Sequence, residues 1–509
     1  MAETDQHEVV EFLSRGASYG RPGETPQRVD THISVVFLLG DRVYKLKRAI
    51  RFSFVDYTSL AARERCCRAE LALNRRTAPA LYRAVRAITR RPEGGLEWDG
   101  SGPAVDFVVE MQRFEERDLF DRMARDGRLD VALMVNLADA IAAFHAEAEP
   151  APGFGGSASL RDVIADNHQY LLSGAPPLER GAVEALFAAS QAALEQASAL
   201  LDARRAGGKV RRCHGDLHLR NICLFGGAPT LFDCIEFSDE IACIDVLYDI
   251  AFLLMDLEHR GLRGLANAVF NRYLDRTQEH AGLAALPLLL STRAGVRAKV
   301  AVASLAVGSA GAAAEAGAYL ALARDLLEPA RPRLIAVGGL SGSGKSTVAA
   351  GLASGFAPAP GARVIRSDVV RKSLMKVAPE TRLPQAAYSA AMNARVYGEL
   401  RAQAFAAVAS GYSAIVDATF IDAAQRADIA AAAGEAGVPF AGLWLGAPDA
   451  VLIGRVERRR GDASDADRAV LMRQLAADTG AISWSHVDVS GSTAESLSAA
   501  QEALGRLKT

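Results

Sequence analysis

A glycine-rich run at residues 339–346, Gly-Leu-Ser-Gly-Ser-Gly-Lys-Ser, constrains the fold of this 509-residue chain more than any other feature. It follows the short apolar stretch 333–338, which has the composition of a buried strand, and an alanine-rich helical pattern begins at Ser346. A strand, a glycine-rich turn and a helix in this order turn backbone N–H groups inward to cradle phosphate. The run therefore predicts a P-loop.

Further strand patterns follow the P-loop and alternate with helical ones. Such alternation is typical of a parallel sheet covered by helices. We expect residues 333–509 to form a three-layer α/β domain of the P-loop NTPase type, with additional strands at 363–366, 415–416 and 440–445.

The P-loop motif assigns a set of nucleotide-binding residues. Its glycines bring the backbone close to phosphate, Lys345 reaches the phosphoryl group that is transferred, and the Ser346 hydroxyl is a Mg²⁺ ligand. Thr347 follows at the start of the helix. The predicted ATP-binding set is Gly339, Ser341, Gly342, Ser343, Gly344, Lys345, Ser346 and Thr347.

Two carboxylates and an arginine stand at the expected strand ends. Asp368 and Arg371 follow the strand 363–366, where Asp368 is suited to take the proton of an attacking hydroxyl and Arg371 to hold the acceptor. The alternative is a helix-capping Asp beside a solvated Arg. Asp417 ends the strand 415–416 and is suited to bind Mg²⁺ through water or to orient the P-loop serine.

An arginine-rich helix at 455–460 runs into Gly461-Asp462-Ala463-Ser464-Asp465. One or two of its guanidinium groups are suited to close over the ATP phosphates, and an exposed basic helix face is the alternative. With Asp368, Arg371 and Asp417, this pattern resembles the P-loop kinases that include polynucleotide 5'-kinases, gluconate kinase and zeta-type toxins. The resemblance implies that Arg455 and Arg459 are lid arginines and that Lys345, Asp368 and Arg371 are catalytic.

A second, unrelated signature lies at His214-Gly215-Asp216-x4-Asn221. Asp216 is suited to accept a proton, and Asn221, five residues on, reaches a metal from the same loop. Asp233 follows a short apolar strand and its turn, where it is placed to supply the main Mg²⁺ ligand. A chance match to the loop pattern is the alternative, and His214 is expected to brace the loop.

The loop resembles those of aminoglycoside phosphotransferases and related small-molecule kinases, which share a bilobal, protein-kinase-like α+β fold. A predicted hairpin at 33–47 carries Lys45 and Lys47, and their spacing puts both side chains on one face, so the choice of phosphate-binding lysine stays open. The resemblance implies that Glu70 is the ion-pair partner of that lysine, with a solvated Glu as the alternative. It also implies that Glu110 and Met111 belong to the hinge that holds adenine.

One departure from the resemblance concerns the cover of the nucleotide. His32-Ile33-Ser34 occupies the place where a Gly-x-Gly-x-x-Gly loop is expected. The first nucleotide site must therefore be closed differently, or it is weak. Because Asp216, Asn221 and Asp233 are all present, the sequence favours an active domain.

The predicted organisation is one kinase-like domain followed by a second. Residues 1–327 form the first, with an N-lobe at about 28–115 and a helical C-lobe at about 116–327. A proline-containing linker at 328–332 separates it from residues 333–509. The whole chain resembles a bacterial class in which an aminoglycoside-phosphotransferase-like domain is fused to an AAA-type or zeta-toxin-like P-loop kinase.

Composition narrows the cellular context. The formal net charge of -2 provides no basic field for a nucleic-acid or membrane partner. The six cysteines form no C-x-x-C pair, and the first ten residues lack a basic and then apolar signal pattern, so we expect a cytoplasmic protein. The apolar stretch 300–323 is broken by Glu315 and is expected to form a packed helix pair.

These observations predict a bifunctional kinase that uses ATP and Mg²⁺ to phosphorylate hydroxyl groups of small molecules. Two alternatives stay open. One is a regulatory switch that senses a ligand and hydrolyses ATP, and the other is phosphorylation of nucleic-acid 5'-hydroxyl ends by the second domain. The sequence indicates neither the acceptors nor the oligomeric state.

Overall fold

The computed structural model describes residues 6–52, 55–174, 178–305, 311–458 and 464–506. The chain divides into two compact units, one of residues 1–162 with 201–256 and the other of residues 163–200 with 257–509. The domain boundary expected at 328–332 stays a prediction. Residues 257–327 belong to the same compact unit as the P-loop fold.

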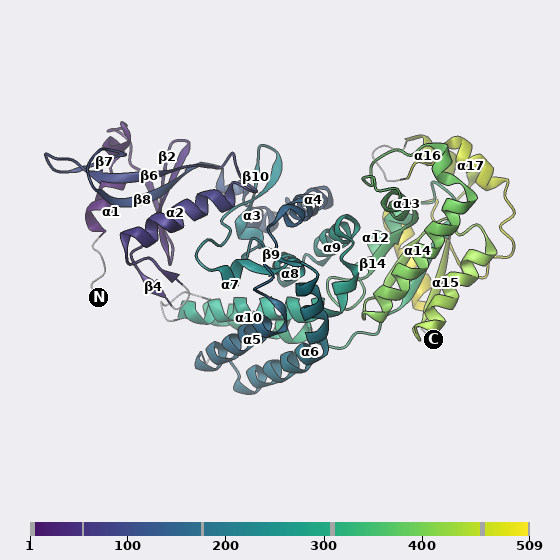
Figure 1. Cartoon of the computed structure of the whole chain (residues 1–509). Coiled ribbons are helices and arrows are strands. Elements are labelled where there is room, and N and C mark those ends of the chain that lie inside the picture. The colour runs from purple at the N-terminus through teal and green to yellow at the C-terminus, as the bar shows by residue number, and fades with distance from the viewer. Residues whose placement is uncertain (1–5, 53–54, 175–177, 306–310, 459–463, 507–509) are drawn as a thin grey trace. The chain divides into compact units, whose positions relative to one another are not determined.

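The first unit contains a six-stranded antiparallel sheet (Figure 1). The predicted hairpin is confirmed, because Val36 pairs with Lys45 and Ser34 with Lys47. In sheet order, the strands are β1 (Gln27–Asp30), β2 (Ser34–Leu39), β3 (Arg42–Lys47), β8 (Ala104–Gln112), β6 (Tyr82–Arg90) and β7 (Leu96–Trp98).

Two helices cover opposite faces of this sheet. Alternate residues of a strand point to opposite faces. Val108 of β8 accordingly packs in one cluster with α1 (His7–Leu13), and its neighbour Val109 packs in another with α2 (Leu60–Asn74). Helix α2 begins after Ser59, whose hydroxyl caps the Ala62 N–H, and it carries Glu70 under the sheet.

Short strands and helices complete the first unit. They frame the His214–Asn221 loop, which lies between β9 and β10, and the segment after β11 that carries Asp233. These elements are α3 (Phe120–Arg125), α4 (Val131–Glu147), β9 (Val210–Arg212), β10 (Ile222–Phe225), β11 (Ala228–Leu231), α7 (Asp239–Ala242) and β12 (Cys243–Asp245); the two-residue strands β4 (Arg51–Phe52) and β5 (Val55–Asp56) pair separately. Helices α5 (Gly156–Ser173), α6 (Arg180–Ala206) and α8 (Val246–His259) each contain a boundary between the units.

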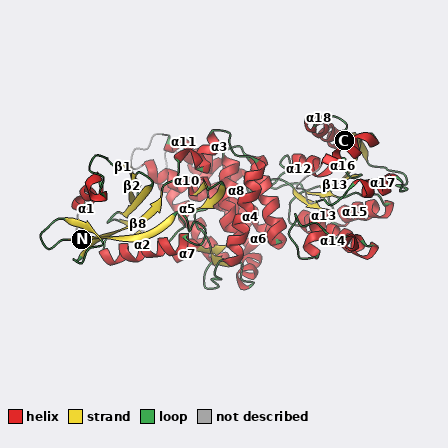
Figure 2. Ribbon diagram, turned by 90° about the horizontal axis from the view of Figure 1, so that it is seen from above, coloured by secondary structure: helices red, strands yellow, loops and turns green. Residues whose placement is uncertain are grey.

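The second unit contains the parallel sheet that the sequence predicts (Figure 2). Its five strands lie in the order β14 (Arg363–Arg366), β15 (Ala414–Asp417), β13 (Leu334–Gly339), β16 (Phe440–Gly446) and β17 (Ser485–Asp488). Leu334 and Ala336 pack on α14 (Ala390–Ala409) and α15 (Ala423–Glu435). Ile335 and Val337 pack on α12 (Lys345–Ala353) and α18 (Thr493–Arg506), so the domain has three layers.

The remaining helices of this unit are α9 (Arg263–Thr277), α10 (Leu286–Leu305), α11 (Ala312–Asp325), α13 (Ser367–Leu374), α16 (Asp449–Arg458) and α17 (Arg468–Leu475). Helices α10 and α11 pack together, as expected for the apolar stretch 300–323 outside residues 306–310. Within the described ranges, no helix is both long and apolar enough to cross a membrane.

Helix α9 covers the free edge of β14. The Asn271 side chain accepts the Val364 N–H at 2.7 Å and donates to the Ala362 carbonyl at 3.1 Å, as a neighbouring strand would. Arg363 forms an ion pair with Asp275 at 2.6 Å, and its side chain is 3% exposed. Because β14 leads directly into Asp368, α9 supports the strand that positions this carboxylate.

Replacing Asn271 tests this edge contact. Asn271→Leu leaves the Val364 N–H without its acceptor, which is expected to cost about 1–3 kcal/mol of stability, while Asn267 still donates to the Ala362 carbonyl at 3.1 Å. We expect faster hydrogen exchange in the peptide covering 362–366 and a lower Tm. Asn271→Asp keeps an acceptor for Val364 and should show a smaller increase; equal exchange in wild type and the Leu variant would contradict the contact.

Candidate active sites

The P-loop connects β13 to α12 and has the backbone conformation that its glycines allow. Gly342 has a φ of +86°, and a Cβ there would lie 2.6 Å from the Leu452 carbonyl oxygen. Lys345 donates to the Leu340 carbonyl at 2.9 Å. The Ser341 N–H donates to the Gln474 side chain of α17 at 2.8 Å, so a carboxamide oxygen meets one of the cradle's donors.

Ser346 and Asp417 come together as the sequence predicts. The Ser346 hydroxyl donates to the Asp417 carboxylate at 2.5 Å, and the Arg366 guanidinium lies 3.6 Å from that carboxylate. Asp417 ends β15, beside the strand that enters the P-loop. Two hard oxygen donors at the start of the P-loop helix fit the ligand preference of Mg²⁺.

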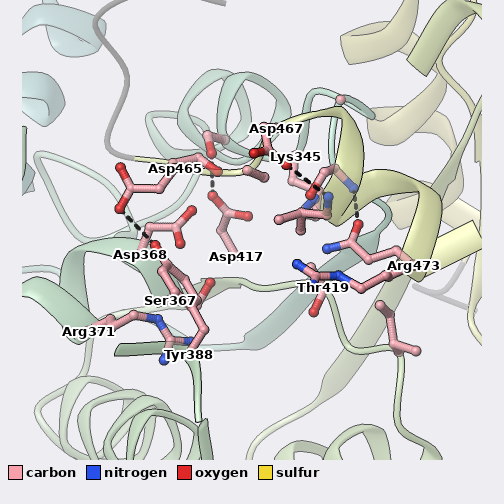
Figure 3. Close-up of a pocket in the computed structure, with 18 of the residues that line it drawn as sticks. Lys345, Ser367, Asp368, Arg371, Tyr388, Asp417, Thr419, Asp465, Asp467 and Arg473 are labelled. Carbon is pink, nitrogen blue, oxygen red and sulfur yellow. Dashed lines mark hydrogen bonds between the residues drawn. The ribbon is translucent and has the colours of Figure 1, made fainter. Parts of the chain in front are cut away.

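Asp368 lies in the same cavity as Lys345 and Asp417 (Figure 3). Burial raises the pKa of Asp368, and the negative charge of Asp417 acts in the same direction, although a hydrogen bond from Ser464 opposes the rise. A carboxylate with a raised pKa is a better proton acceptor than an ordinary one. Its position at the start of α13 follows from β14, which ends at Arg366.

Arg371 lies one helical turn beyond Asp368 and is buried. It donates to the Ala387 carbonyl at 3.0 Å, and its guanidinium lies 4.6 Å from the centre of the Tyr388 ring. The Tyr388 hydroxyl in turn donates to Asp465 at 2.7 Å. Arg371 and Tyr388 therefore form a fixed wall of the cavity. The alternative interpretation expected a solvated arginine, whereas Arg371 is buried.

The predicted lid contributes to the cavity in part. Arg455 lines it and donates to the Gly491 carbonyl at 3.1 Å, whereas Arg459 lies outside the described residues. Sequence reasoning missed Arg382, Arg473 and Gln474, which also line this cavity of about 980 Å³. None of the motifs used in the sequence analysis includes these three positions.

The first unit brings its predicted residues together around Glu70. One carboxylate oxygen of Glu70 accepts from Lys45 at 2.9 Å and the other from Lys47 at 2.7 Å. Lys45 also pairs with Asp233 and keeps 15% of its side chain exposed, while Lys47 is 1% exposed and pairs with Glu236. Burial alone would raise the pKa of Glu70, but the two ammonium groups outweigh it and lower the pKa to about 2.

Asp216 and Asn221 contact each other within the central loop. The Asn221 amide nitrogen donates to the Asp216 carboxylate at 2.8 Å and to its carbonyl at 2.9 Å, which leaves the amide oxygen as the atom suited to a cation. His218, for which the sequence indicated no role, places a ring nitrogen 3.3 Å from the same carboxylate. Asp233 has a left-handed φ of +60°.

Asp249 braces this loop from below. Its buried carboxylate accepts the N–H groups of His214 and Gly215 at 3.1 and 2.9 Å and contacts His145 at 3.0 Å. Burial lowers the pKa of His214, whose ring contacts the Phe232 carbonyl at 2.9 Å. A neutral, buried ring fits the bracing role expected for His214.

Two placements differ from the expected nucleotide pocket. Glu110 and Met111 lie inside β8, which is paired with β3 on one side and β6 on the other. Their backbone groups belong to the sheet, so a hinge with available groups would begin after Gln112. At the position where the resemblance led us to expect a glycine-rich loop, residues 31–34 form a tight turn. The Thr31 hydroxyl accepts the Ser34 N–H there at 2.9 Å.

Comparison with known proteins places both parts in families. Residues 39–286 match the model of the phosphotransferase enzyme family, and residues 334–479 match that of an AAA domain. Proteins of Mycobacterium tuberculosis H37Rv and Mycobacterium bovis, both described as uncharacterized, are 30% identical over 463 residues, which cover 89% of this chain and 90% of theirs. The chain belongs to their family. It carries a phosphotransferase-family domain fused to a P-loop domain, and it is a kinase-type phosphotransferase.

Solved structures resemble one part of the chain or the other. A gluconokinase from Sinorhizobium meliloti 1021 is 23% identical and covers 35% of this chain and 93% of its own, with a TM-score of 0.25. A choline/ethanolamine kinase family protein from Mesorhizobium loti is 14% identical and covers 63% of this chain and 95% of its own, with a TM-score of 0.39. No substrate follows from likenesses at this level.

Replacing Glu70 tests the buried charge network of the phosphotransferase-family domain. Glu70→Gln leaves Lys45 and Lys47 short of one negative charge, which we expect to cost about 3–5 kcal/mol. Because the folded pKa of about 2 lies below the ordinary 4.5, the wild-type advantage is full above pH 4.5 and shrinks as the pH falls toward 2.

The measurement is thermal unfolding of both proteins across this pH range. Glu64→Gln on the same helix is the control, since the Glu64 pair with Arg68 is exposed and worth at most about 1 kcal/mol. Similar losses in the two variants would contradict the assignment.

Proposed function

We propose that the protein is a bifunctional kinase that transfers the γ-phosphoryl group of ATP to hydroxyl groups of small molecules at two separate sites. The observation that carries this proposal is the cavity of the P-loop domain. It joins a nucleotide cradle, a Ser–Asp pair, a partly buried carboxylate and a fixed arginine in one space. A nucleotide switch needs the cradle and a group that orients water, but it has no use for a fixed arginine that holds an acceptor.

In the P-loop domain, each residue has a role that follows from its position. Lys345 neutralises charge on the transferred phosphoryl group, and Ser346 and Asp417 are suited to hold Mg²⁺, which would offset phosphate charge when bound. Asp368 takes the proton of the acceptor hydroxyl while the hydroxyl oxygen forms a bond to the γ-phosphorus. The bond between this phosphorus and ADP breaks, and ADP leaves with its electrons. Arg371 orients the acceptor, and Arg455 closes over the phosphates.

In the phosphotransferase-family domain, Lys45 binds ATP phosphate and Asp216 takes the acceptor proton. Asp233 and Asn221 offer a carboxylate and an amide oxygen, a donor set that suits Mg²⁺. The support for Lys45 over Lys47 is its partial exposure and its contact with Asp233. A cytoplasmic location and small polar acceptors remain part of the proposal.

The two sites are tested with labelled ATP and a metabolite library. Lys345→Ala should abolish products of the P-loop domain and leave those of the first, and Asp216→Ala should do the reverse, so each variant controls the other. Removal of a catalytic base or phosphate lysine is expected to cost about 10²–10⁴-fold in kcat. Release of inorganic phosphate without any labelled acceptor would contradict the kinase proposal.

The pH profile of the P-loop reaction tests Asp368. A base must be deprotonated to act, and the pKa of Asp368 is raised, chiefly by burial. We therefore expect kcat/KM to fall on the acid side, beginning above the ordinary range of an aspartate. Asp422→Asn, at another carboxylate lining the cavity, should retain the acid limb. An acid limb that persists in Asp368→Asn would rule out this base.

A further inference from the structure

The charged network around Glu70 includes two residues, Lys47 and Glu236, to which the proposed function gives no role. Lys47 pairs with Glu236 as well as with Glu70, and Glu236 accepts the Tyr57 hydroxyl at 2.7 Å. The side chains of Lys47 and Glu236 are 1% and 5% exposed. Charges this deeply buried cost several kcal/mol to desolvate, so each must be matched by a partner.

The geometry of these pairs is a double clamp. Lys45 and Lys47 lie two residues apart on one face of β3, and they hold Asp233 and Glu236, which lie three residues apart in the segment after β11. Glu70 divides its two oxygens between the lysines. The segment that carries Asp233 is thereby attached to the sheet at two charged points.

The clamp matters because Asp233 has an unfavourable backbone. Its φ of +60° is costly for a residue with a side chain and persists where the surroundings hold it. The backbone N–H of Asp233 donates to the Tyr82 hydroxyl at 3.1 Å, and that of Cys234 donates to Asn74 at 2.9 Å. Glu236 adds a charged anchor at the end of the same short segment.

We propose that Lys47 and Glu236 are positioning residues that hold Asp233 ready for the metal–nucleotide complex, with Lys47 acting through carboxylates and not on phosphate. This inference rests on the proposed function of the phosphotransferase-family domain. The inference gives a separate role to each lysine of β3, since Lys45 alone is proposed to bind ATP phosphate. The clamp fixes Asp233 from the sheet side, in a domain without a glycine-rich loop.

The test uses the full chain carrying Lys345→Ala, so that ATP binding by the P-loop domain is disabled. Calorimetry measures the affinity for a non-hydrolysable ATP analogue with Mg²⁺ and with EDTA. In Glu236→Gln and Lys47→Met, we expect metal-free affinity within about twofold of the parent, while the enhancement by Mg²⁺ falls about 10–100-fold, as for lost support of a metal ligand. Lys45→Met should weaken binding under both conditions.

Two further variants separate positioning from general stability. Asp106→Asn breaks another buried pair of the same lobe, Arg63 with Asp106 at 2.8 Å, and should lower the Tm without changing the Mg²⁺ enhancement. Tyr57→Phe removes one hydrogen bond to Glu236 and should give a smaller loss of enhancement in a protein that still folds.

Three results would overturn the inference while leaving the proposed function of the first site intact. One is unchanged Mg²⁺ enhancement in Glu236→Gln, and a second is metal-free binding weakened as much by Lys47→Met as by Lys45→Met. The third is equal loss of enhancement in Asp106→Asn. If the Lys345→Ala parent binds no nucleotide under either condition, the proposed function of the first site fails, and the positioning role fails with it.

Discussion

Both sites are built around carboxylates that are shielded from water. The cations and hydrogen-bond donors around each carboxylate decide whether it stays charged. In the phosphotransferase-family domain, Glu70 is fully buried and stays charged because an ammonium group meets each of its oxygens. Lys45 and Lys47 of β3 also form ion pairs with Asp233 and Glu236, which attach these two carboxylates to the sheet. Helix α2, the sheet and the segment after β11 are thus fixed relative to one another by charge as well as by apolar packing.

In the P-loop domain, the two carboxylates of the cavity have different surroundings. Asp417 is paired with the Ser346 hydroxyl and lies near Arg366, whereas Asp368 is partly buried in the same cavity and has a raised pKa. Full compensation would lower the proton affinity of Asp368 and make it a poor base. Burial outweighs the hydrogen bond that Ser464 gives to Asp368, so the two aspartates of the cavity are suited to separate uses, Asp417 for a cation and Asp368 for a proton.

Sequence reasoning succeeded where strand order alone determines proximity. Parallel strands end at the same edge of a sheet, so Ser346, Asp368 and Asp417 could be placed together from their positions after three predicted strands. It could not choose between Lys45 and Lys47, because the difference lies in their partners Asp233 and Glu236, almost 190 residues away in the chain. Glu236 lies three residues after the predicted metal ligand Asp233, but no sequence pattern pairs it with Lys47, and no motif includes Gln474. The strand β17 was missed because its four residues, Ser-His-Val-Asp, contain a single apolar side chain.

The predicted linker at 328–332 lies inside the second compact unit of the chain. Residues 257–327 group with the P-loop fold, and within that unit Asn271 satisfies the outward-facing backbone of β14. An uncovered edge strand exposes unpaired N–H and C=O groups and invites association with other chains. Because α9 precedes the predicted linker while β14 follows it, cutting the chain at residue 332 would remove the cover from the strand that leads into Asp368. The catalytic geometry proposed for the P-loop domain therefore depends on residues that its own family match, 334–479, does not include.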